Sequence, residues 1–493
     1  MTDEKKAVGI GYRQARYQEP LLFEMEASAK GRLIPDCPIE PDIVPKNLAR
    51  TSLDLPELNE VDVIRHYTRL AEMNYGVDNG IYPLGSCTMK YNPKVCETVA
   101  GMPGFAEIHP YQNEETVQGI LKCLYELQEA LKEVSGMAGV SLQPMAGAHG
   151  EFTGILVIEA YHRARNNRER DEILVPDTAH GTNPASAAMV GYKVIEIPSK
   201  DGCVDLDALK AAVGEKTAGL MLTNPNTLGI FEKDICEVAK IVHDAGGLVY
   251  YDGANLNAII GICRPGDMGF DVLHFNLHKT FATPHGGGGP GSGPIGVRED
   301  LVPFLPVPVV SVEDGVYYLD YDLEHTIGKV SGHFGNIGVC IKAWAYVKLL
   351  GGKGLRDVGE MSVLNSNYMK DLLKGTFGFP HRDLRKHEFV LSAKCPTCEG
   401  IKALNIAKRL LDYGVHPPTI YFPLIVEEAM MFEPTETEPK KELDRVVEAM
   451  LAIAKEDKQI VLSAPHSVKV SKVDETLAAK DPILSYKGLK AHK

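Results

Sequence analysis

The sequence predicts an α/β fold in which a mostly parallel sheet is covered by helices on both faces. Between residues 170 and 280, short apolar runs alternate with segments whose apolar residues recur at helical spacing. This alternation is typical of βαβ units, whose strands run parallel. The chain of 493 residues is also too long for one compact core, so we expect several domains.

The order of predicted elements follows from these apolar runs. Before the sheet, the apolar residues between 117 and 134 fall on one face, which predicts an amphipathic helix ending near Gly136. A second helix is expected over 233–245, because the Gly-Gly pair at 246–247 would stop it. Five apolar runs are expected to be strands: 174–175, 193–197, 219–222, 248–251 and 272–275.

We divide the chain into three parts. Residues 1–75 contain a proline-rich and charged arm followed by a helix at 61–74, and we expect this part to contact another subunit. A frayed terminus is the alternative for the arm. Residues 76–350 contain the predicted sheet. Residues 351–493 form a smaller α/β unit and a tail, with helices near 354–374, 400–413 and 440–457 and strands near 388–393 and 459–463.

Composition and charge argue against several classes of function. The formal net charge of −14 disfavours nucleic acid or an anionic membrane as the main partner. No apolar run is long enough to cross a bilayer and no secretory leader is evident, so we expect a cytoplasmic protein with reduced thiols. Cys395 and Cys398 form one CxxC pair, which favours a plain loop over zinc, and we predict no metal site.

Lys279 and Asp252 are the residues that indicate chemistry. Each ends a short apolar run, so both are expected beyond the carboxyl ends of the strands, where ligands collect in such sheets. A fixed lysine amine can form a Schiff base with an aldehyde, and a carboxylate can keep a pyridine nitrogen protonated. Taken alone, Lys279 would be interpreted as an ordinary surface lysine and Asp252 as an ordinary aspartate of a turn. Together they predict a pyridoxal 5'-phosphate (PLP) site with the cofactor covalently bound to Lys279.

Three further strand-end turns could reach the same cofactor. The turn containing Ala148 and His149 precedes a helix and could receive a phosphate, or could be an ordinary strand-to-helix turn. His180 could lie on the face of the cofactor ring, while residues 182–183 could equally form a helix cap. Thr227 lies in a polar turn that could reach the ring, although turn chemistry alone also explains that segment.

Three other features of the sequence have two interpretations each. His278 would point away from Lys279 on an extended backbone, which favours a phosphate or a neighbouring subunit as its contact. The glycine run at 286–289 allows close backbone approach, and is either a phosphate loop or lid or a flexible segment. Cys87 lies in a loop rich in helix breakers, and we expect a small buried thiol there rather than a redox centre.

In this order the motifs resemble those of the glycine dehydrogenase (decarboxylating) family, the P-protein of the glycine cleavage system, among the fold-type-I PLP enzymes. The resemblance lies within residues 80–335, and the flanking segments fit it as well. Four segments carry it: 82–91 (YPLGSCTMKY), 146–151 (AGAHGE), 179–185 (AHGTNPA) and 277–291 (LHKTFATPHGGGGPG).

The resemblance implies roles for individual residues. Lys279 looks like the Schiff-base lysine, Asp252 like the partner of the pyridinium nitrogen, and His180 like the histidine that stacks on the ring. Further cofactor contacts are implied for the phosphate-anchoring turn and for the segment before the lysine: Ala148, His149, Asn276 and His278.

The resemblance also implies a reaction and its partners. The reaction is decarboxylation of glycine with transfer of the aminomethyl group to the lipoyl arm of H-protein. In single-chain family members this stretch is only the C-terminal half, so the chain resembles subunit 2 of a split enzyme. Its implied partner is a homologous subunit 1, in a heterotetramer whose interface would include the N-terminal arm.

Other functions remain as alternatives. The nearest is another fold-type-I enzyme, such as a cysteine desulfurase, an aminotransferase or an amino-acid decarboxylase, and the loop at 86–90 and the glycine run argue against it. A non-catalytic partner subunit would be expected to lack the lysine that this chain has at position 279. A metal-binding protein built on the histidines and the CxxC pair is the most distant alternative.

Overall fold

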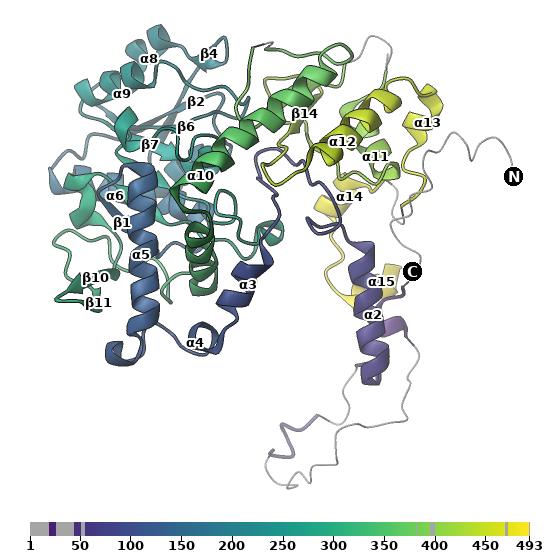
Figure 1. Cartoon of the computed structure of the whole chain (residues 1–493), viewed down its shortest axis with the longest axis horizontal. Coiled ribbons are helices and arrows are strands. Elements are labelled where there is room, and N and C mark those ends of the chain that lie inside the picture. The colour runs from purple at the N-terminus through teal and green to yellow at the C-terminus, as the bar shows by residue number, and fades with distance from the viewer. Residues whose placement is uncertain are drawn as a thin grey trace, which may run out of the picture.

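The computed structural model describes residues 19–25, 44–50, 55–381, 383–394, 400–468 and 472–492. Much of the predicted N-terminal arm therefore lies outside the described residues, as do Cys395 and Cys398 of the CxxC pair. Within the part described, helices long and apolar enough to span a membrane are absent. Figure 1 shows a larger unit, a smaller unit beside it, and a group of terminal helices that stands off both.

A seven-stranded sheet forms the centre of the larger unit, in the order β1-β9-β8-β7-β6-β2-β3. Neighbouring strands from β3 to β8 are parallel, whereas β9 is antiparallel to both β8 and β1. The predicted mostly parallel sheet is confirmed. The strands are β1 (Gly139–Ser141), β2 (Glu172–Pro176), β3 (Lys193–Ile197), β6 (Thr217–Thr223), β7 (Leu248–Asp252), β8 (Val272–His274) and β9 (Ile295–Val297).

Helices bury both faces of this sheet, which explains why β6 and β7 are apolar throughout. Alternate residues of β7 enter different cores: Tyr251 packs in the cluster that holds α5 (Gln118–Ser135) and α9 (Ile235–Asp244). Tyr250 packs in the cluster that holds α6 (Gly147–Ala164) and α7 (Thr182–Val190). The period of two along the strand therefore places helices on each face.

Two of the predicted helices end at the glycines that the sequence indicated. Helix α5 ends at Gly136, which adopts a left-handed backbone with φ of 73°. Helix α9 ends just before the Gly-Gly pair, and Gly246 has φ of 82°. In both places the left-handed conformation explains why the sequence has glycine.

The smaller unit contains a three-stranded antiparallel sheet, in the order β12-β14-β13, with its own buried core. The long helix α10 (Ile337–Leu373) connects the two units, and Gly351 interrupts it with a non-helical backbone at φ 61° and ψ −177°. The other elements of this unit are β12 (Phe389–Ser392), β13 (Thr419–Ile420), β14 (Ala429–Phe432), α11 (Ala403–Asp412), α12 (Lys440–Ile453) and α13 (Lys458–Ser463).

The predicted strand at 459–463 is wrong, because this segment is helix α13. Asp457 caps the helix by accepting a hydrogen bond from the backbone N–H of Gln459 at 2.8 Å. Only Val461 is buried within the helix. A short apolar run of this length fits a strand and a helix equally well, and the capping aspartate was the signal that distinguishes them.

The remaining elements are short or peripheral. They are η1 (Leu22–Glu24), α2 (Glu60–Met73), α3 (Lys94–Ala100), α4 (Pro103–Ala106), η2 (Glu114–Thr116), β4 (Ser199–Lys200), β5 (Cys203–Val204), α8 (Leu206–Ala212), η3 (Gly253–Ala258), η4 (Gly266–Met268), η5 (Gly286–Gly288), η6 (Glu299–Phe304), β10 (Val309–Glu313), β11 (Val316–Asp320), α14 (Glu475–Lys480) and α15 (Tyr486–His492).

Segments near the two ends of the chain pack on each other in the terminal group of helices (Figure 1). The ring of Tyr486 in α15 stacks on Phe23 with ring centroids 4.8 Å apart. His66 of α2 is buried and lies 2.9 Å from Glu19. The other faces of α2 are not covered by this packing, and three of its apolar side chains are exposed: Val61, Ile64 and Tyr67.

The loop before α3 brings residues 86–90 between the two units. It pairs with the end of β14, because Leu84 bridges Phe432 and the Gly85 N–H donates to the Met431 carbonyl at 3.2 Å. A side chain at Gly85 would place its Cβ 2.2 Å from the Met431 side chain, so only glycine permits this close approach.

Candidate active site

Asp252 and Lys279 lie at the carboxyl ends of adjacent parallel strands. Asp252 is the last residue of β7, is buried, and accepts a hydrogen bond from the Ala254 N–H at 2.9 Å. Lys279 lies in the turn after β8, where its own N–H donates to the Asn276 carbonyl at 3.0 Å. Its side-chain amine donates to the Ser86 carbonyl at 2.8 Å. The strand order therefore brings the two predicted residues to one edge of the sheet.

Asp252 is held in its ionised form. Burial by itself would raise the pKa of this carboxyl group, but His274, His180, Lys279 and the Ala254 N–H together outweigh burial and lower the pKa. His274 is the nearest of these groups, with its Nε2 3.5 Å from Asp252 Oδ1. A buried carboxylate that stays ionised is the group that a protonated pyridine nitrogen requires.

Glu151 forms a second buried carboxyl group beside Asp252, and sequence reasoning did not single it out. Burial and the charge of Asp252 raise the pKa of Glu151 to about 8, so this side chain is mostly protonated at neutral pH. Thr182 donates to Glu151 Oε2 at 3.1 Å. Asn183, with its amide nitrogen facing the two acids, donates to Glu151 Oε2 at 3.1 Å and to Asp252 Oδ2 at 3.2 Å.

His180 lies beside this acidic pair. Burial lowers the pKa of its imidazole, which is therefore neutral. Its Nδ1 lies 2.7 Å from the Thr182 hydroxyl, and its ring meets Phe422 edge-on at 5.9 Å between centroids. The N-cap of α7 is Gly181, with no side-chain cap bond among the described residues, so the alternative of a cap at 182–183 does not hold. Thr182 instead links His180 to Glu151.

Ala148 and His149 lie in the first turn of α6. The N-cap of this helix is Ala146, with no side-chain cap bond in the described part of the chain, so the first N–H groups remain available to an anion. A Cβ at Gly147 would lie 2.1 Å from Asn276 Oδ1, so only glycine lets the helix end approach Asn276 this closely. His149 is turned back onto its own segment, where its Nδ1 accepts from the Met145 N–H at 3.2 Å.

Asn276 and Thr227 are buried and already bonded within the protein. The Asn276 side-chain nitrogen lies 2.9 Å from His274 Nε2, so it supports the histidine that faces Asp252. The Thr227 hydroxyl donates to the Thr178 carbonyl at 2.9 Å. Both residues therefore help to shape the turns at the sheet edge.

His278 does not lie on an extended backbone, so the premise used to orient it is wrong. The N–H groups of Lys279 and Thr280 both donate to the Asn276 carbonyl, which makes residues 276–280 a turn. His278 Nδ1 accepts from the Ser292 N–H at 3.3 Å, and burial lowers the pKa of this imidazole to about 3. Asn276, a residue type that favours turns, stands at the start of this turn and was not used as a signal.

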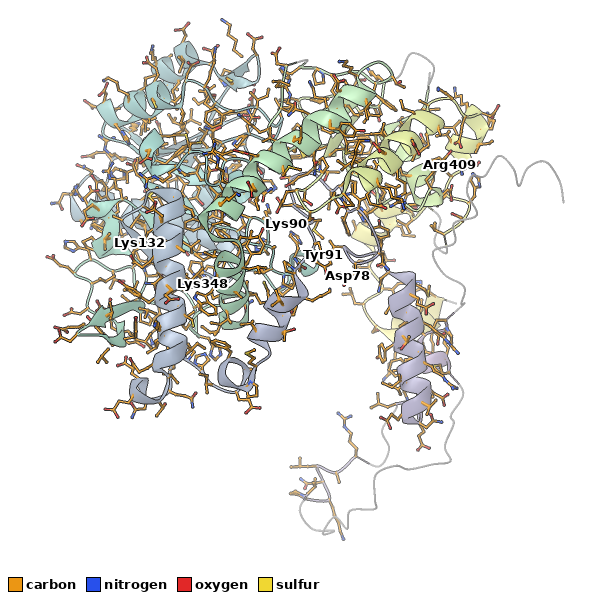
Figure 2. The ribbon with its side chains drawn as sticks, viewed as in Figure 1. Asp78, Lys90, Tyr91, Lys132, Lys348 and Arg409 are labelled. Atoms are coloured by element: carbon orange, nitrogen blue, oxygen red, sulfur yellow. The ribbon has the colours of Figure 1, made fainter. Side chains whose placement is uncertain are left out.

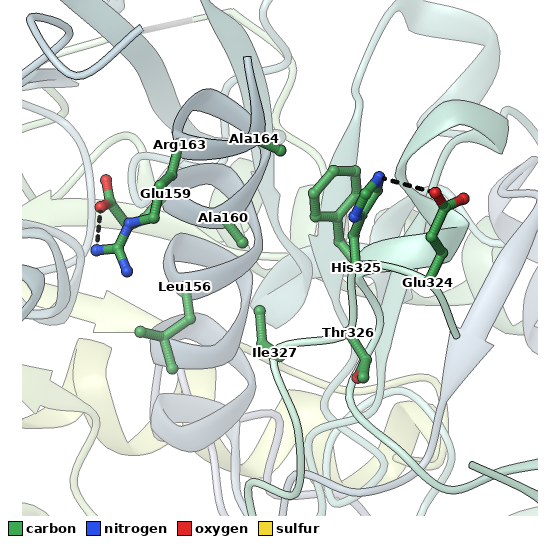
Figure 3. Close-up of a pocket in the computed structure, with 10 residues that line it drawn as sticks. Leu156, Glu159, Ala160, Arg163, Ala164, Glu324, His325, Thr326 and Ile327 are labelled. Atoms are coloured by element: carbon green, nitrogen blue, oxygen red, sulfur yellow. Dashed lines mark hydrogen bonds and ion pairs between the residues drawn. The ribbon is translucent and has the colours of Figure 1, made fainter. Parts of the chain in front are cut away.

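Two cavities differ in their relation to these residues. One of about 270 Å³ is lined by His278, Tyr82, Lys90 and the start of the glycine run at 286–287, and so adjoins the turn that carries Lys279. Another, of about 500 Å³, lies on the outer face of α6 between Leu156, Arg163 and Ile327 (Figure 3). As far as the structure describes its lining, none of the predicted site residues belongs to this second cavity.

The residues present fit PLP. The ionised and buried Asp252 suits a pyridinium nitrogen, and the free amine of Lys279 suits an aldehyde. The uncapped start of α6 suits a phosphate, because its N–H groups converge where Gly147 removes the obstruction of a side chain. Each of these three features matches one functional group of the cofactor.

Comparisons with known proteins agree with this geometry. A family model described as glycine cleavage system P-protein matches residues 39–315, and one described as glycine dehydrogenase, C-terminal domain, matches residues 358–476. A protein of Pyrococcus abyssi named probable glycine dehydrogenase (decarboxylating) subunit 2 is 60% identical, covering 98% of each chain. A protein of the same name from Thermococcus onnurineus is 59% identical, covering 97% of each chain.

Solved structures show the same fold. A glycine decarboxylase (P-protein) crystallised in inhibitor-bound form matches with a TM-score of 0.70 at 24% identity, covering 83% of this chain and 93% of that chain. A cysteine desulfurase from Escherichia coli matches with a TM-score of 0.59 at 17% identity, covering 76% of this chain and 95% of that chain. The predicted fold class of PLP enzymes is therefore confirmed.

Proposed function

The chain belongs to the glycine cleavage system P-protein family, and from this membership we propose that it is the PLP-bearing subunit of a two-subunit glycine dehydrogenase (decarboxylating). The relatives of that name match it over nearly their whole length. One observation of the structure carries the proposal: a buried, ionised Asp252 and the amine of Lys279 lie at the ends of adjacent strands. An amine for the Schiff base and a carboxylate for the ring nitrogen are the groups that this class of PLP site uses.

In the proposed reaction, PLP supplies an electron sink for the electron pair that glycine keeps when it loses CO2. Lys279 would hold the cofactor through its aldehyde. Asp252 keeps the ring nitrogen protonated, and the first turn of α6 at Ala148 and His149 binds the phosphate. His180, which is neutral, lies on the ring and can accept a proton.

We propose further contacts of the cofactor at Asn276, His278 and Thr227. Asn276 supports the pyridine-binding carboxylate through His274, and His278 and Thr227 complete the turns around the ring. We propose, from membership of the family, that the lipoyl arm of H-protein receives the aminomethyl fragment. We propose a cytoplasmic location, which the scattered cysteines support, since those that the structure describes are free.

The second part of the proposal concerns assembly. A homologous subunit 1 completes the enzyme, in a heterotetramer, and residues 1–75 form part of the contact. The support is the face of α2 that carries Val61, Ile64 and Tyr67, whose apolar side chains are exposed in this chain alone. We retain the division into residues 76–350 and 351–493, which the helix interruption at Gly351 supports.

Exchange of labelled bicarbonate into the carboxyl group of glycine tests the reaction. The exchange is measured with PLP and lipoylated carrier protein, with and without subunit 1. We expect exchange only in the complete mixture, and its loss in Lys279→Ala but not in Lys132→Ala, which removes a partly exposed lysine of α5. Exchange by this chain without subunit 1 would contradict the two-subunit proposal. Exchange retained by Lys279→Ala would contradict the assigned lysine.

A further inference from the structure

The turn that holds the Lys279 amine has an unusual backbone. Ser86 and Thr88 have φ angles of 67° and 47°, in the left-handed region that non-glycine residues rarely adopt. For a β-branched residue such as Thr88 the conformation is a clear outlier. Such residues persist only when their surroundings impose the conformation.

Two glutamates of the smaller unit hold the turn. Glu388 immediately precedes β12, and its Oε2 accepts a hydrogen bond from the Ser86 N–H at 2.9 Å. Glu433 immediately follows β14, and its Oε2 accepts from the Thr88 N–H at 2.9 Å while its Oε1 accepts from the Thr88 hydroxyl. Both glutamates are buried. The two left-handed residues are therefore each bonded to a different buried carboxyl group.

The same turn contacts Lys279, and Glu388 also contacts the segment after Asp252. The Ser86 carbonyl accepts from the Lys279 amine at 2.8 Å. The Asn255 side chain, in η3 directly after Asp252, donates to Glu388 Oε1 at 3.3 Å. Glu388 and the reactive lysine are therefore connected through the backbone of a single residue, Ser86, whose N–H bonds to the glutamate and whose carbonyl bonds to the lysine.

Burial favours the protonated form of this carboxyl pair. Burial and the proximity of Glu433 raise the pKa of Glu388 well above its usual range, and burial raises the pKa of Glu433 to about 7. His387 lies beside both, with its Nε2 3.7 Å from Glu433 and 3.9 Å from Glu388, and burial lowers its pKa to about 3. The pair therefore keeps at least one proton at neutral pH.

A divalent cation is the competing interpretation, because His387, Glu388 and Glu433 each offer a ligand atom and these atoms lie within 4.8 Å of one another. Neither ring nitrogen of His387 has a hydrogen-bond partner among the described residues. All four carboxyl oxygens, however, already accept hydrogen bonds from Ser86, Thr88 or Asn255. Each oxygen thus has one donor and keeps a second lone pair, so metal retention is measured beside the hydrogen-bond test below.

We propose that Glu388 and Glu433 are positioning residues, which hold the Ser86–Thr88 turn in its left-handed conformation and thereby set where the Lys279 amine lies. Neither glutamate reacts itself. The proposal rests on the proposed function only in taking Lys279 as the reactive lysine. It assigns the smaller unit a role in the geometry of a site whose cofactor-binding residues belong to the larger unit.

The test uses Glu433→Ala and Glu433→Gln in the full chain. Glutamine resembles the protonated acid, since its oxygen can accept from the Thr88 N–H and its nitrogen can donate to the Thr88 hydroxyl. We therefore expect the alanine variant to disrupt the turn and the glutamine variant to preserve it. Glu448→Ala, at an exposed position of α12, is the matched control in the same unit.

The first readout is alkylation of Cys87, followed by mass spectrometry of its peptide, because this cysteine lies between the two left-handed residues and is mostly shielded. We expect alkylation about tenfold faster in Glu433→Ala, and within about threefold of the parent in Glu433→Gln. The second readout is the rate at which bound PLP is lost to a trapping reagent, which should rise in Glu433→Ala and not in Glu433→Gln. Thr88→Ala removes the hydroxyl donor and keeps the N–H donor, so both readouts should change in the same direction by a smaller amount.

Three results would overturn the proposal. Unchanged Cys87 alkylation in Glu433→Ala and Thr88→Ala would show that the glutamate does not hold the turn. A glutamine variant as disturbed as the alanine variant would show that a charge is needed. Stoichiometric metal retained on dialysis by the parent, and lost from Glu433→Gln, would establish a cation site instead. Alkylation is measured without glycine or carrier protein, so failure of the proposed reaction would leave this readout unaffected.

Discussion

Removing the cation of Lys90 should destabilise the junction between the two units. Lys90 is buried, and its amine donates to Glu436 at 2.6 Å, to the Thr280 carbonyl at 2.8 Å and to Asn257 Oδ1 at 2.9 Å. Figure 2 shows it where the larger and smaller units meet. Lys90→Met keeps an unbranched apolar side chain there but leaves the Glu436 carboxylate without its cation.

The magnitude follows from the burial of both partners. Removing one member of a buried ion pair costs roughly 3–5 kcal/mol, because the remaining charge stays desolvated. Glu436 keeps weaker contacts with Asn257 and Tyr346, at 3.4 Å each, so we expect the lower end, about 3 kcal/mol. Lys94→Met is the matched control, because its ion pair with Asp78 is exposed and should contribute about 1 kcal/mol at most.

The assay is urea unfolding of the parent, of Lys90→Met, of Glu436→Gln and of the double variant. Replacing both partners removes the unpaired charge. We therefore expect the double variant to lose less free energy of unfolding than the two single variants lose together, by at least about 1 kcal/mol. If the losses in free energy of unfolding of the two single variants add up to that of the double variant within about 0.5 kcal/mol, the reasoning is refuted, because independent sites behave in that way. A loss in Lys90→Met no larger than that in Lys94→Met would refute it as well.

Four further predictions concern the site and its partner. Asp252→Asn should retain part of the PLP but lose most of its turnover, measured as bicarbonate exchange, because the ring nitrogen is no longer kept protonated. Gly253→Ala should lose PLP binding, measured by visible absorbance, since its Cβ would lie 1.8 Å from the His274 carbonyl oxygen. Glu151 has a raised folded pKa of about 8, so its contribution to stability is present below its usual pKa and is lost as pH rises through about 8. Between about pH 5 and pH 9 the Tm of Glu151→Gln should therefore fall less than that of the parent. Subunit 1 should raise the Tm of this chain, and replacing Ile64 with Asp should abolish that rise without lowering the Tm of the chain alone.

The sheet and the position of Asp252 and Lys279 at its edge were predictable because parallel strands leave a simple pattern. Strands buried on both faces appear as apolar runs, and polar residues directly after them must lie at one edge. Asp252 and Lys279 were found in this way. The turn at 276–280 was not, because Asn276 at its start was not used as a turn signal.

The contribution of the smaller unit could not be predicted. Glu388 and Glu433 appear in the sequence as ordinary acidic residues beside short apolar runs, and such residues are usually exposed. Their burial depends on the pairing of a distant loop with β14, which no local pattern encodes. Glu151 was likewise visible within its motif, but its proximity to Asp252 depends on how α6 crosses the sheet.

The contacts of the left-handed turn also set an order for folding during synthesis. Thr88 bonds to Glu433, 345 residues further along the chain, and Ser86 bonds to Glu388, 302 residues further along. At roughly 5–20 residues per second, translation separates Thr88 from its partner by on the order of 20 to 70 s. Lys279 itself precedes Glu433 by 154 residues, so for about 8 to 31 s at those rates it can be exposed to free aldehydes before its surroundings exist. A nascent or truncated chain that ends before residue 388 would present the lysine without the turn that fixes it.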